Sequence, residues 1–268
     1  MPGTVRSEVV EEGIVLLTLD RPDRLNAMSI ELVADLHAAL DDVAADRSCR
    51  VVVLTGAGRG FCAGLDLKGI GPNPASEGLG RAPAGLTTQQ HIATLVPHLR
   101  SLRQPVIAAV NGPATGGGFA LALASDVRIA ATSARFGTAF VRLGLSGCDI
   151  GVSWLLPRLI GAGRAFELML TGRVFDTAEA DRLGLLTRVV PDDELLTSAL
   201  ETARLVAGNS PFGVWLTKEV MWSNLEVGSL QAGIDLENRS QILASFTEDH
   251  PEAMAAFLEK RAPDFRYR

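Results

Sequence analysis

The sequence predicts an α/β fold, and two observations support this. Apolar runs bounded by glycine or polar residues recur through the first two-thirds of the chain, which is typical of strands covered on both faces. These runs are residues 13–20, 51–55, 105–110 and 126–131. Segments with helical periodicity lie between them, so the chain repeats strand–helix units. After about residue 150 the strand signal fades, and we expect a core over residues 1–200 followed by a helical region over residues 201–268.

Several helices have clear boundaries in the sequence. Ser29 is expected to cap a helix whose apolar positions, beginning at Leu32 and Val33, fall on one face. Residues 194–207, 213–222 and 251–261 read as amphipathic helices, the last with a proline in its first turn. Residues 69–85 are rich in glycine and proline, which predicts a mobile surface loop. Such a loop is either a dispensable insertion or a lid over a site.

Composition excludes several classes of protein. Of the 268 residues 47% are hydrophobic and 21% charged, and the net charge of −6 offers no footprint for nucleic acid or an anionic membrane. Three cysteines without a CxxC pair predict neither a disulfide framework nor a metal site. The start lacks an apolar signal core, and no apolar run is long enough to span a bilayer. We therefore expect a cytoplasmic protein.

Two glycine-rich loops follow predicted strands. "GAGRGFCAGLDL" begins like a dinucleotide fingerprint, but Phe61 occupies the place of the third glycine and no GK[ST] follows. Nucleotide binding is therefore disfavoured. The second loop, "NGPATGGGF", opens a helix. Backbone N–H groups from two such junctions could converge on one oxygen as an oxyanion hole, although each loop alone also fits an ordinary tight turn.

These loops and further segments together resemble the crotonase superfamily, the enoyl-CoA hydratase/isomerase family. The segments that match in order and spacing are "RPDRLNAMS", "GRGFCAGLDLK", "PVIAAVNGPATGGGFALALASDVRIA", "FGTAFVRLGL", "LTGRVFDTAEADRLGLLTRVV" and "AFLEKRAPDF". The resemblance implies a crotonase-like spiral of ββα units with a C-terminal helical region that builds a homo-trimer, often paired into a hexamer. It implies an enzyme of fatty acid or related acyl-CoA metabolism that acts on an enoyl-CoA. Coenzyme A enters as part of the thioester substrate, with no permanently bound cofactor.

The resemblance also implies site residues. The backbone N–H groups of Ala63 and Gly117 would be the oxyanion donors. Phe257 and Lys260 resemble residues that reach a neighbouring subunit's ligand, although a core phenylalanine and a surface lysine are the simpler interpretation. The residues implied in substrate or CoA binding are Arg24, Leu25, Ala27, Ala63, Gly64, Leu65, Asp66, Leu67, Lys68, Gly117, Phe140, Phe257 and Lys260. Among these, Asp66 is expected to fix its own loop rather than to carry protons.

The chain departs from the family at the acids. Hydratases carry two glutamates, and their places are held here by Ala120 and Phe140. Asp149 is the remaining candidate acid/base, and its alternative role is to cap the helix that starts near Gly151. Three functions stay open: an enzyme of the hydratase/isomerase type, a dienoyl- or enoyl-CoA isomerase with Asp149 as its one acid/base, and a non-catalytic acyl-CoA-binding protein.

Overall fold

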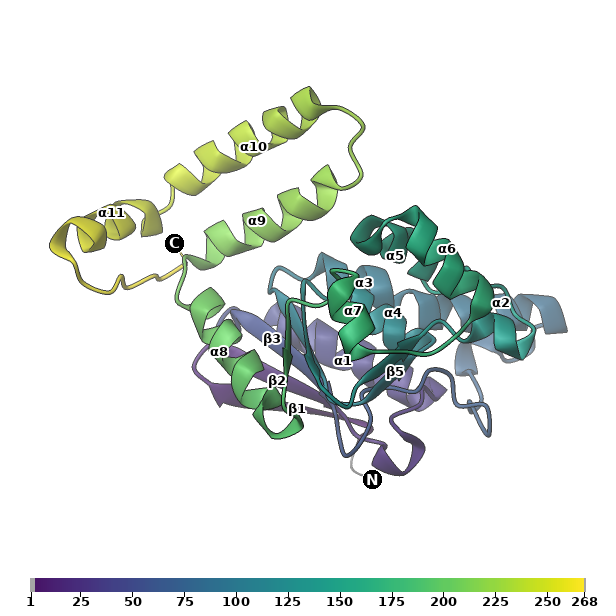
Figure 1. Cartoon of the computed structure of the whole chain (residues 1–268). Coiled ribbons are helices and arrows are strands. Elements are labelled where there is room, and N and C mark those ends of the chain that lie inside the picture. The colour runs from purple at the N-terminus through teal and green to yellow at the C-terminus, as the bar shows by residue number, and fades with distance from the viewer. Residues whose placement is uncertain (1–2, 268) are drawn as a thin grey trace.

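The computed structural model describes residues 3–267, and its centre is a mostly parallel six-stranded sheet (Figure 1). The strand order is β1-β2-β3-β4-β6-β9, with β1 antiparallel to β2 and every other neighbouring pair parallel. These strands are β1 (Val5–Glu11), β2 (Ile14–Leu19), β3 (Val51–Gly56), β4 (Val106–Val110), β6 (Val127–Ala131) and β9 (Arg188–Val190). A smaller sheet of order β5-β7-β8 contains β5 (Pro113–Thr115), β7 (Arg135–Gly137) and β8 (Phe175–Asp176). The four predicted strands are confirmed.

The large sheet is buried on both faces, as its apolar runs predict. In β3, Val52 and Leu54 belong to one hydrophobic cluster, whereas Val51 and Val53 belong to the other. Alternating side chains of one strand thus enter two cores. The first core is covered by α1 (Ile30–Ala45), α3 (Leu95–Ser101) and α4 (Gly117–Ala124), and the second by α8 (Leu195–Ala207). Residue 200 lies inside α8, and the predicted division of the chain there stays a prediction.

The first long helix begins where the sequence predicts. Ser29 is the N-cap of α1, and its hydroxyl accepts a hydrogen bond from the Leu32 amide at 3.2 Å. This bond satisfies one of the free N–H groups in the first helical turn. The buried residues Leu36 and Leu40 continue the apolar face.

The segment expected to be a loop over residues 69–85 is partly helical. A short 3-10 turn, η2 (Pro74–Ser76), is followed by α2 (Arg81–Ala93), so the loop prediction is wrong for residues 81–85. Pro83 lies in the first turn, where its missing N–H costs no hydrogen bond, so it does not prevent the helix. Helix α2 buries little besides Ile92.

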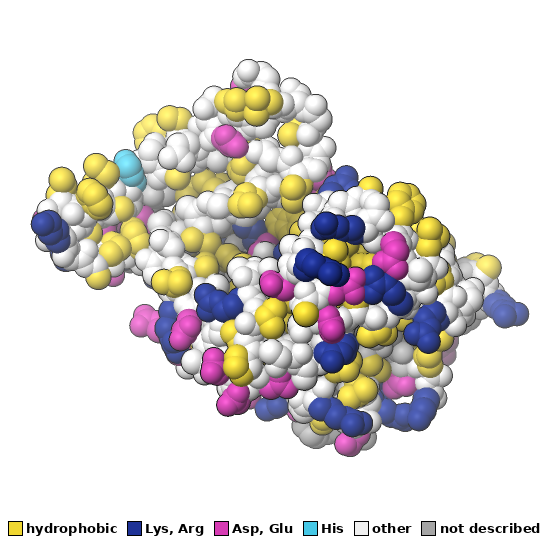
Figure 2. Space-filling view, in the orientation of Figure 1, with side chains coloured by type: hydrophobic (Ala, Val, Ile, Leu, Met, Phe, Trp, Pro, Cys, Tyr) yellow, Lys and Arg dark blue, Asp and Glu magenta, His cyan; other side chains and the backbone are white. Residues whose placement is uncertain are grey.

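The C-terminal helices form an arm that projects from the core (Figure 1). The arm consists of α9 (Pro211–Asn224), α10 (Leu230–Ser245) and α11 (Asp249–Glu259). Lys218 fixes α9 to the core, because its buried Nζ lies 2.9 Å from Oδ2 of Asp126. Figure 2 shows hydrophobic side chains spread over the arm, and Leu230, Phe246 and Phe257 are each more than 80% exposed. The remaining helices are η1 (Pro22–Arg24), η3 (Phe140–Leu143), α5 (Val152–Ile160), α6 (Ala162–Thr171), α7 (Thr177–Arg182) and η4 (Asp192–Glu194).

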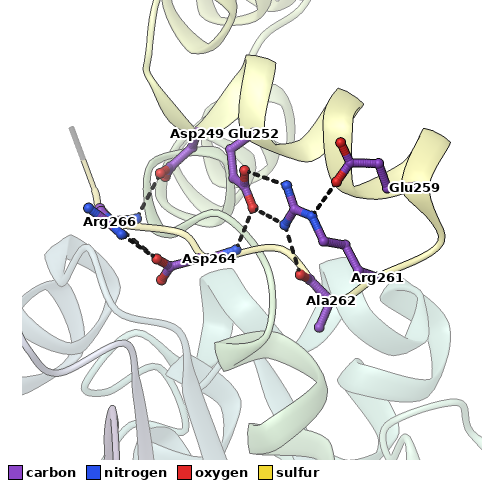
Figure 3. A network of polar contacts seen from close by, with 7 residues as sticks. All are labelled: Asp249, Glu252, Glu259, Arg261, Ala262, Asp264 and Arg266. Atoms are coloured by element: carbon purple, nitrogen blue, oxygen red, sulfur yellow. Dashed lines mark hydrogen bonds and ion pairs between the residues drawn. The ribbon is translucent and has the colours of Figure 1, made fainter.

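The chain after α11 folds back along the helix through polar contacts (Figure 3). The Arg261 guanidinium lies 2.6 Å from Oε1 and 2.9 Å from Oε2 of Glu252, whose Oε1 also accepts the Asp264 amide at 2.8 Å. The hydrogen bonds from Arg261 lower the pKa of Glu252 to about 2. The backbone amide of Arg266 donates to the buried Asp249 at 2.9 Å. Because the Arg261 pair is exposed to solvent, it orients the tail more than it stabilises the fold.

No helix within residues 3–267 is both long and apolar enough to cross a membrane.

Candidate functional site

The structure brings the two glycine-rich loops side by side. Cys62 and Ala114 form a parallel bridge, in which the Cys62 amide donates to Pro113 O and the Thr115 amide donates to Cys62 O, both at 3.0 Å. The Thr115 hydroxyl adds a bond to Ala63 O at 2.9 Å. The two strand–loop junctions therefore share one edge, as the sequence predicts.

Two glycines allow this approach. A methyl group on Gly118 would lie 2.0 Å from the carbonyl oxygen of Cys62, which is far inside contact distance. Gly64 has φ +89, and a methyl group there would lie 2.8 Å from the carbonyl oxygen of Thr115. Only glycine fits at both places, because any side chain would meet the backbone of the other loop.

The expected donor at Ala63 is wrong in this structure. The Ala63 amide donates to the Leu25 carbonyl at 3.0 Å, so it is not free to bind a ligand. Met28 pairs with the next segment, since its amide donates to Gly64 O at 2.7 Å and its carbonyl accepts from Asp66 N at 2.9 Å. In an extended segment the intervening residue points its N–H away from that partner.

The free amide in this loop is therefore that of Leu65, which lies between the two groups bonded to Met28. Gly117 is the first residue of α4, and its N–H has no partner within the helix. Neither amide has a hydrogen-bond acceptor within residues 3–267. The positive end of the α4 dipole adds to the donor at Gly117. Nothing in the sequence itself distinguishes Leu65 from Ala63, because the difference depends on pairing with residues 25–28.

Apolar side chains line the approach to Gly117. A methyl group there would lie 2.8 Å from Sδ of Met28 and 3.8 Å from Cδ1 of Ile150. The Phe140 ring lies 3.6 Å from the corresponding position on Gly116. Sequence reasoning placed Phe140 in the site and missed Met28.

The two positions that lack glutamates have apolar surroundings. Ala120 is fully buried in α4, and Phe140 is 8% exposed at the start of η3. Neither side chain can carry a proton. The remaining candidate acid, Asp149, directly precedes Ile150, whose side chain lies near Gly117.

Asp149 does not cap a helix. The N-cap of α5 is Gly151, which has no side-chain capping bond. The Asp149 Oδ1 atom instead accepts hydrogen bonds from the amide of Ile150 at 2.7 Å and from Nε2 of Gln89 at 2.6 Å. The capping alternative is therefore wrong. Gln89 comes from α2, a partner that the sequence did not suggest.

The backbone beside Asp149 is strained. Ile150 has φ 41, a conformation that β-branched residues rarely adopt and that costs about 1 to 3 kcal/mol. Its amide donates to Asp149, and its side chain is buried beside Gly117. Strain of this kind concentrates at functional sites.

Two polar residues hold the glycine-rich loop that contains Leu65 in place through hydrogen bonds. Asp66 accepts hydrogen bonds from Arg21 at 2.9 Å and from the Lys68 amide at 3.1 Å, and the Arg21 bond is the main reason that the pKa of Asp66 is lowered. Buried Asn26 donates to the carbonyl oxygens of Ala57 at 3.0 Å and of Gly60 at 2.7 Å. Asp66 thus fixes its loop, as expected, whereas Asn26 was missed.

The predicted CoA-binding residues fall into two groups. The segments around Leu25–Ala27 and Gly64–Lys68 lie together through the backbone bonds to Leu25 and Met28, with Arg24, Leu67 and Lys68 exposed beside them. Phe257 and Lys260 lie on the arm, far from α2 and β5 (Figure 1). Phe257 is 81% exposed, so its interpretation as a core residue is wrong.

Helix α2 rests on a stack of histidines. Nδ1 of His37 lies 2.9 Å from Nδ1 of His98, and the His37 ring also stacks on His91 with centroids 5.2 Å apart. Burial, and then the neighbouring His37, lower the pKa of both His91 and His98, while Asp41 at 3.3 Å from His98 acts in the opposite direction. His91 is thus a packing residue of α2.

This stack predicts a pH dependence of stability. Because the folded pKa values lie below the ordinary value of 6.5, the unfolded chain binds more protons at mildly acidic pH. The free energy of unfolding should be constant just above pH 6.5 and should fall as the pH falls from there through the lower folded values. Urea unfolding between pH 5 and 8 measures this slope. His91→Gln should flatten it, because this removes one of the two groups with a lowered pKa, whereas His250→Gln on α11 should not, and equal slopes in all three proteins would contradict the assignment.

Known proteins match almost the whole of this chain. The sequence model of the family described as Enoyl-CoA hydratase/isomerase matches residues 9–268. A probable enoyl-CoA hydratase of Mycobacterium tuberculosis, EchA12, is 47% identical over 253 residues, which cover 94% of this chain and 89% of the relative. The 1,2-epoxyphenylacetyl-CoA isomerase of Escherichia coli is 42% identical over 257 residues, 96% of each chain.

A solved structure matches the fold over almost the whole chain. The crystal structure of a probable enoyl-CoA hydratase/isomerase from Mycobacterium abscessus superposes with a TM-score of 0.93 at 40% identity, covering 99% of this chain and all of the other. The predicted crotonase-like fold, with its C-terminal helical region, is confirmed. The chain therefore belongs to the enoyl-CoA hydratase/isomerase family and is a CoA-thioester enzyme of the hydratase/isomerase type.

Proposed function

We propose that the protein isomerises an enoyl-CoA, with Asp149 as its acid/base and the amides of Leu65 and Gly117 as its oxyanion hole. Asp149 removes a proton from the carbon chain, and the electrons move through the double bond onto the thioester oxygen. The two amides stabilise that enolate. The same proton then returns to a different carbon, so the double bond moves and the composition is unchanged.

The observation that carries this proposal is that the site has one candidate acid/base, Asp149, where hydratases carry two glutamates. Addition of water across a double bond needs one group to activate the water and one to deliver the proton, and positions 120 and 140 hold alanine and phenylalanine. Isomerisation needs one base that also acts as the acid. Asp149 fits that role because its neighbour Ile150 lies against Gly117, beside the proposed oxyanion hole.

The two backbone amides provide most of the stabilisation of the enolate. Removing one preorganised oxyanion donor typically costs about 3 kcal/mol of transition-state energy. Leu65 and Gly117 offer amides without competing acceptors, and Gly117 adds a helix N-terminus. Their main-chain origin explains why α4 can begin with two glycines and carry no catalytic side chain in its first turn.

The CoA portion is proposed to lie along the two paired segments at residues 24–27 and 63–68. Arg24 and Lys68 are exposed there and can meet phosphate groups, while Leu25, Ala27 and Leu67 can meet the pantetheine arm. These roles were implied by the family resemblance. They are supported here by the pairing of the two segments.

Incubation with 2-enoyl-, 3-enoyl- and dienoyl-CoA thioesters, followed by liquid chromatography and mass spectrometry, tests the function. Isomerisation gives a product of unchanged mass and altered retention time. A product heavier by one water would instead identify a hydratase, and binding without any product would identify a non-catalytic acyl-CoA-binding protein. An epoxyacyl-CoA belongs in the panel, because one relative is named as an isomerase of such a compound.

We further propose that residues 201–268 assemble the chain into a homo-trimer or hexamer, with residues 1–200 as the catalytic core. The exposed apolar side chains of Leu230, Phe246 and Phe257 support this. Phe257 and Lys260 would then reach the ligand of a neighbouring subunit. Sedimentation velocity measures the assembly, and a single-chain mass at micromolar concentration would contradict it.

A further inference from the structure

The carboxylate of Asp149 accepts hydrogen bonds at one of its two oxygen atoms. Its Oδ1 atom accepts two hydrogen bonds, from Nε2 of Gln89 at 2.6 Å and from the amide of Ile150 at 2.7 Å. Its Oδ2 atom has no hydrogen-bond partner within residues 3–267. The two oxygens of one carboxylate therefore differ, because one is occupied by donors and the other is free to take a proton.

We propose that Gln89 is a positioning residue that orients Asp149, so that Oδ2 exchanges the proton with the substrate. This inference rests on the proposed role of Asp149. A side-chain amide N–H stabilises a carboxylate more than a carboxylic acid, since the carboxylate is the stronger acceptor. Gln89 cannot itself act as an acid or base at ordinary pH, and it acts through Asp149.

The second donor is fixed by the backbone. The Ile150 amide donates to Oδ1 of the residue before it, within a turn in which Ile150 adopts φ 41 and Gly151 adopts φ 81. The buried Ile150 side chain holds this conformation in place. Gln89 is thus the donor that a side-chain substitution can remove without changing the strained turn.

The helix that carries Gln89 is attached mainly at its far end. In α2, Ile92 is buried and His91 stacks on His37. The preceding turns are largely exposed. The Gln89–Asp149 bond therefore links α2 directly to the acid across 60 positions of sequence. The placement of α2 determines whether the carboxylate has one donor or two.

The experiment compares Gln89→Leu, which keeps a similar size and removes the donor, with Gln90→Leu, a matched control on the neighbouring exposed position. Steady-state kinetics on the isomerised enoyl-CoA are measured from pH 5 to 9. Gln89→Leu should lower kcat about tenfold with KM within a factor of two, since a bond to a charged group contributes on this scale. Binding of an unreactive acyl-CoA should stay within a factor of two of wild type, because the substitution removes an orienting bond and not a substrate contact.

Gln89→Glu provides a second, independent variant. A carboxylate has no N–H to donate to Oδ1 of Asp149, so Gln89→Glu should lower kcat at least as far as Gln89→Leu, again with little change in KM. Gln90→Leu should keep the wild-type profile. A wild-type kcat in both Gln89 variants, or a loss of kcat matched by an equal loss of acyl-CoA affinity, would mean a merely structural contact and would overturn the proposal.

Asp149→Asn separates this inference from the function on which it rests. If Asp149→Asn is inactive and the Gln89 variants keep the wild-type profile, the positioning role fails and the function of Asp149 stands. If Asp149→Asn keeps the wild-type rate, or the wild-type protein converts no CoA thioester, both fail together. Circular dichroism of each variant confirms that the fold is retained.

Discussion

Asp149→Asn should lower kcat/KM for enoyl-CoA isomerisation by about 10³-fold while leaving acyl-CoA binding nearly unchanged. Asparagine keeps the shape of the side chain and an oxygen that can accept from Gln89 and Ile150. It cannot take up a proton, so the step that forms the enolate loses its base. The thioester oxygen would still meet the amides of Leu65 and Gly117.

The measurement pairs steady-state kinetics with isothermal titration of an unreactive acyl-CoA. Asp181→Asn on α7 is the matched control, because Asp181 is an exposed aspartate with no proposed role in the site. A variant at Asp149 with more than a tenth of the wild-type rate would mean that another group moves the proton. A variant that also lost acyl-CoA affinity would place Asp149 in binding rather than in catalysis.

Gly118→Ala should have the largest effect on stability. The new methyl group would lie 2.0 Å from the carbonyl oxygen of Cys62 and 2.7 Å from its Cβ atom. Both belong to the adjoining glycine loop, so the loops must separate and the Cys62–Ala114 bridge must break. Overpacking of a backbone contact of this kind costs about 3 kcal/mol or more.

Urea unfolding of the purified variant measures this loss. Gly163→Ala in α6 is the control, because a methyl group there meets nothing within 4 Å and the substitution favours the helix by about 0.5 to 1 kcal/mol. The separation of the loops should also move the amide of Gly117 and abolish turnover in any Gly118→Ala protein that folds. A stable and active Gly118→Ala protein would contradict the close approach of the two loops.

Local patterns in the sequence were sufficient for most of the fold. The apolar runs at 51–55 and 105–110 could be identified as strands because a strand that is buried on both faces needs an apolar residue at nearly every position. The helix after Ser29 could be interpreted because its cap and its apolar face are both local. Helix α2 was harder, since its glycine and proline content outweighed a weak apolar face.

The candidate site was only partly predictable, for a physical reason. The choice between Ala63 and Leu65 depends on hydrogen bonds to Leu25 and Met28, which lie more than 30 positions away in sequence. The contact between Gln89 and Asp149 spans 60 positions and involves an exposed residue with no local signal. The type of a residue was enough to suggest some of the proposed site residues. The residues that they contact are determined by the tertiary fold.

The free amide at position 65 has a consequence for how such a chain can change. The Leu65 side chain is 40% exposed, and the group proposed to bind the thioester oxygen is the peptide N–H, which every residue except proline carries. Random substitution at codon 65 should therefore yield many active clones and one dead class, those encoding proline. The proposed oxyanion donor therefore depends little on the side chain at this position. New reactions can then arise when carboxylate residues are gained or lost at other positions around an unchanged oxyanion hole.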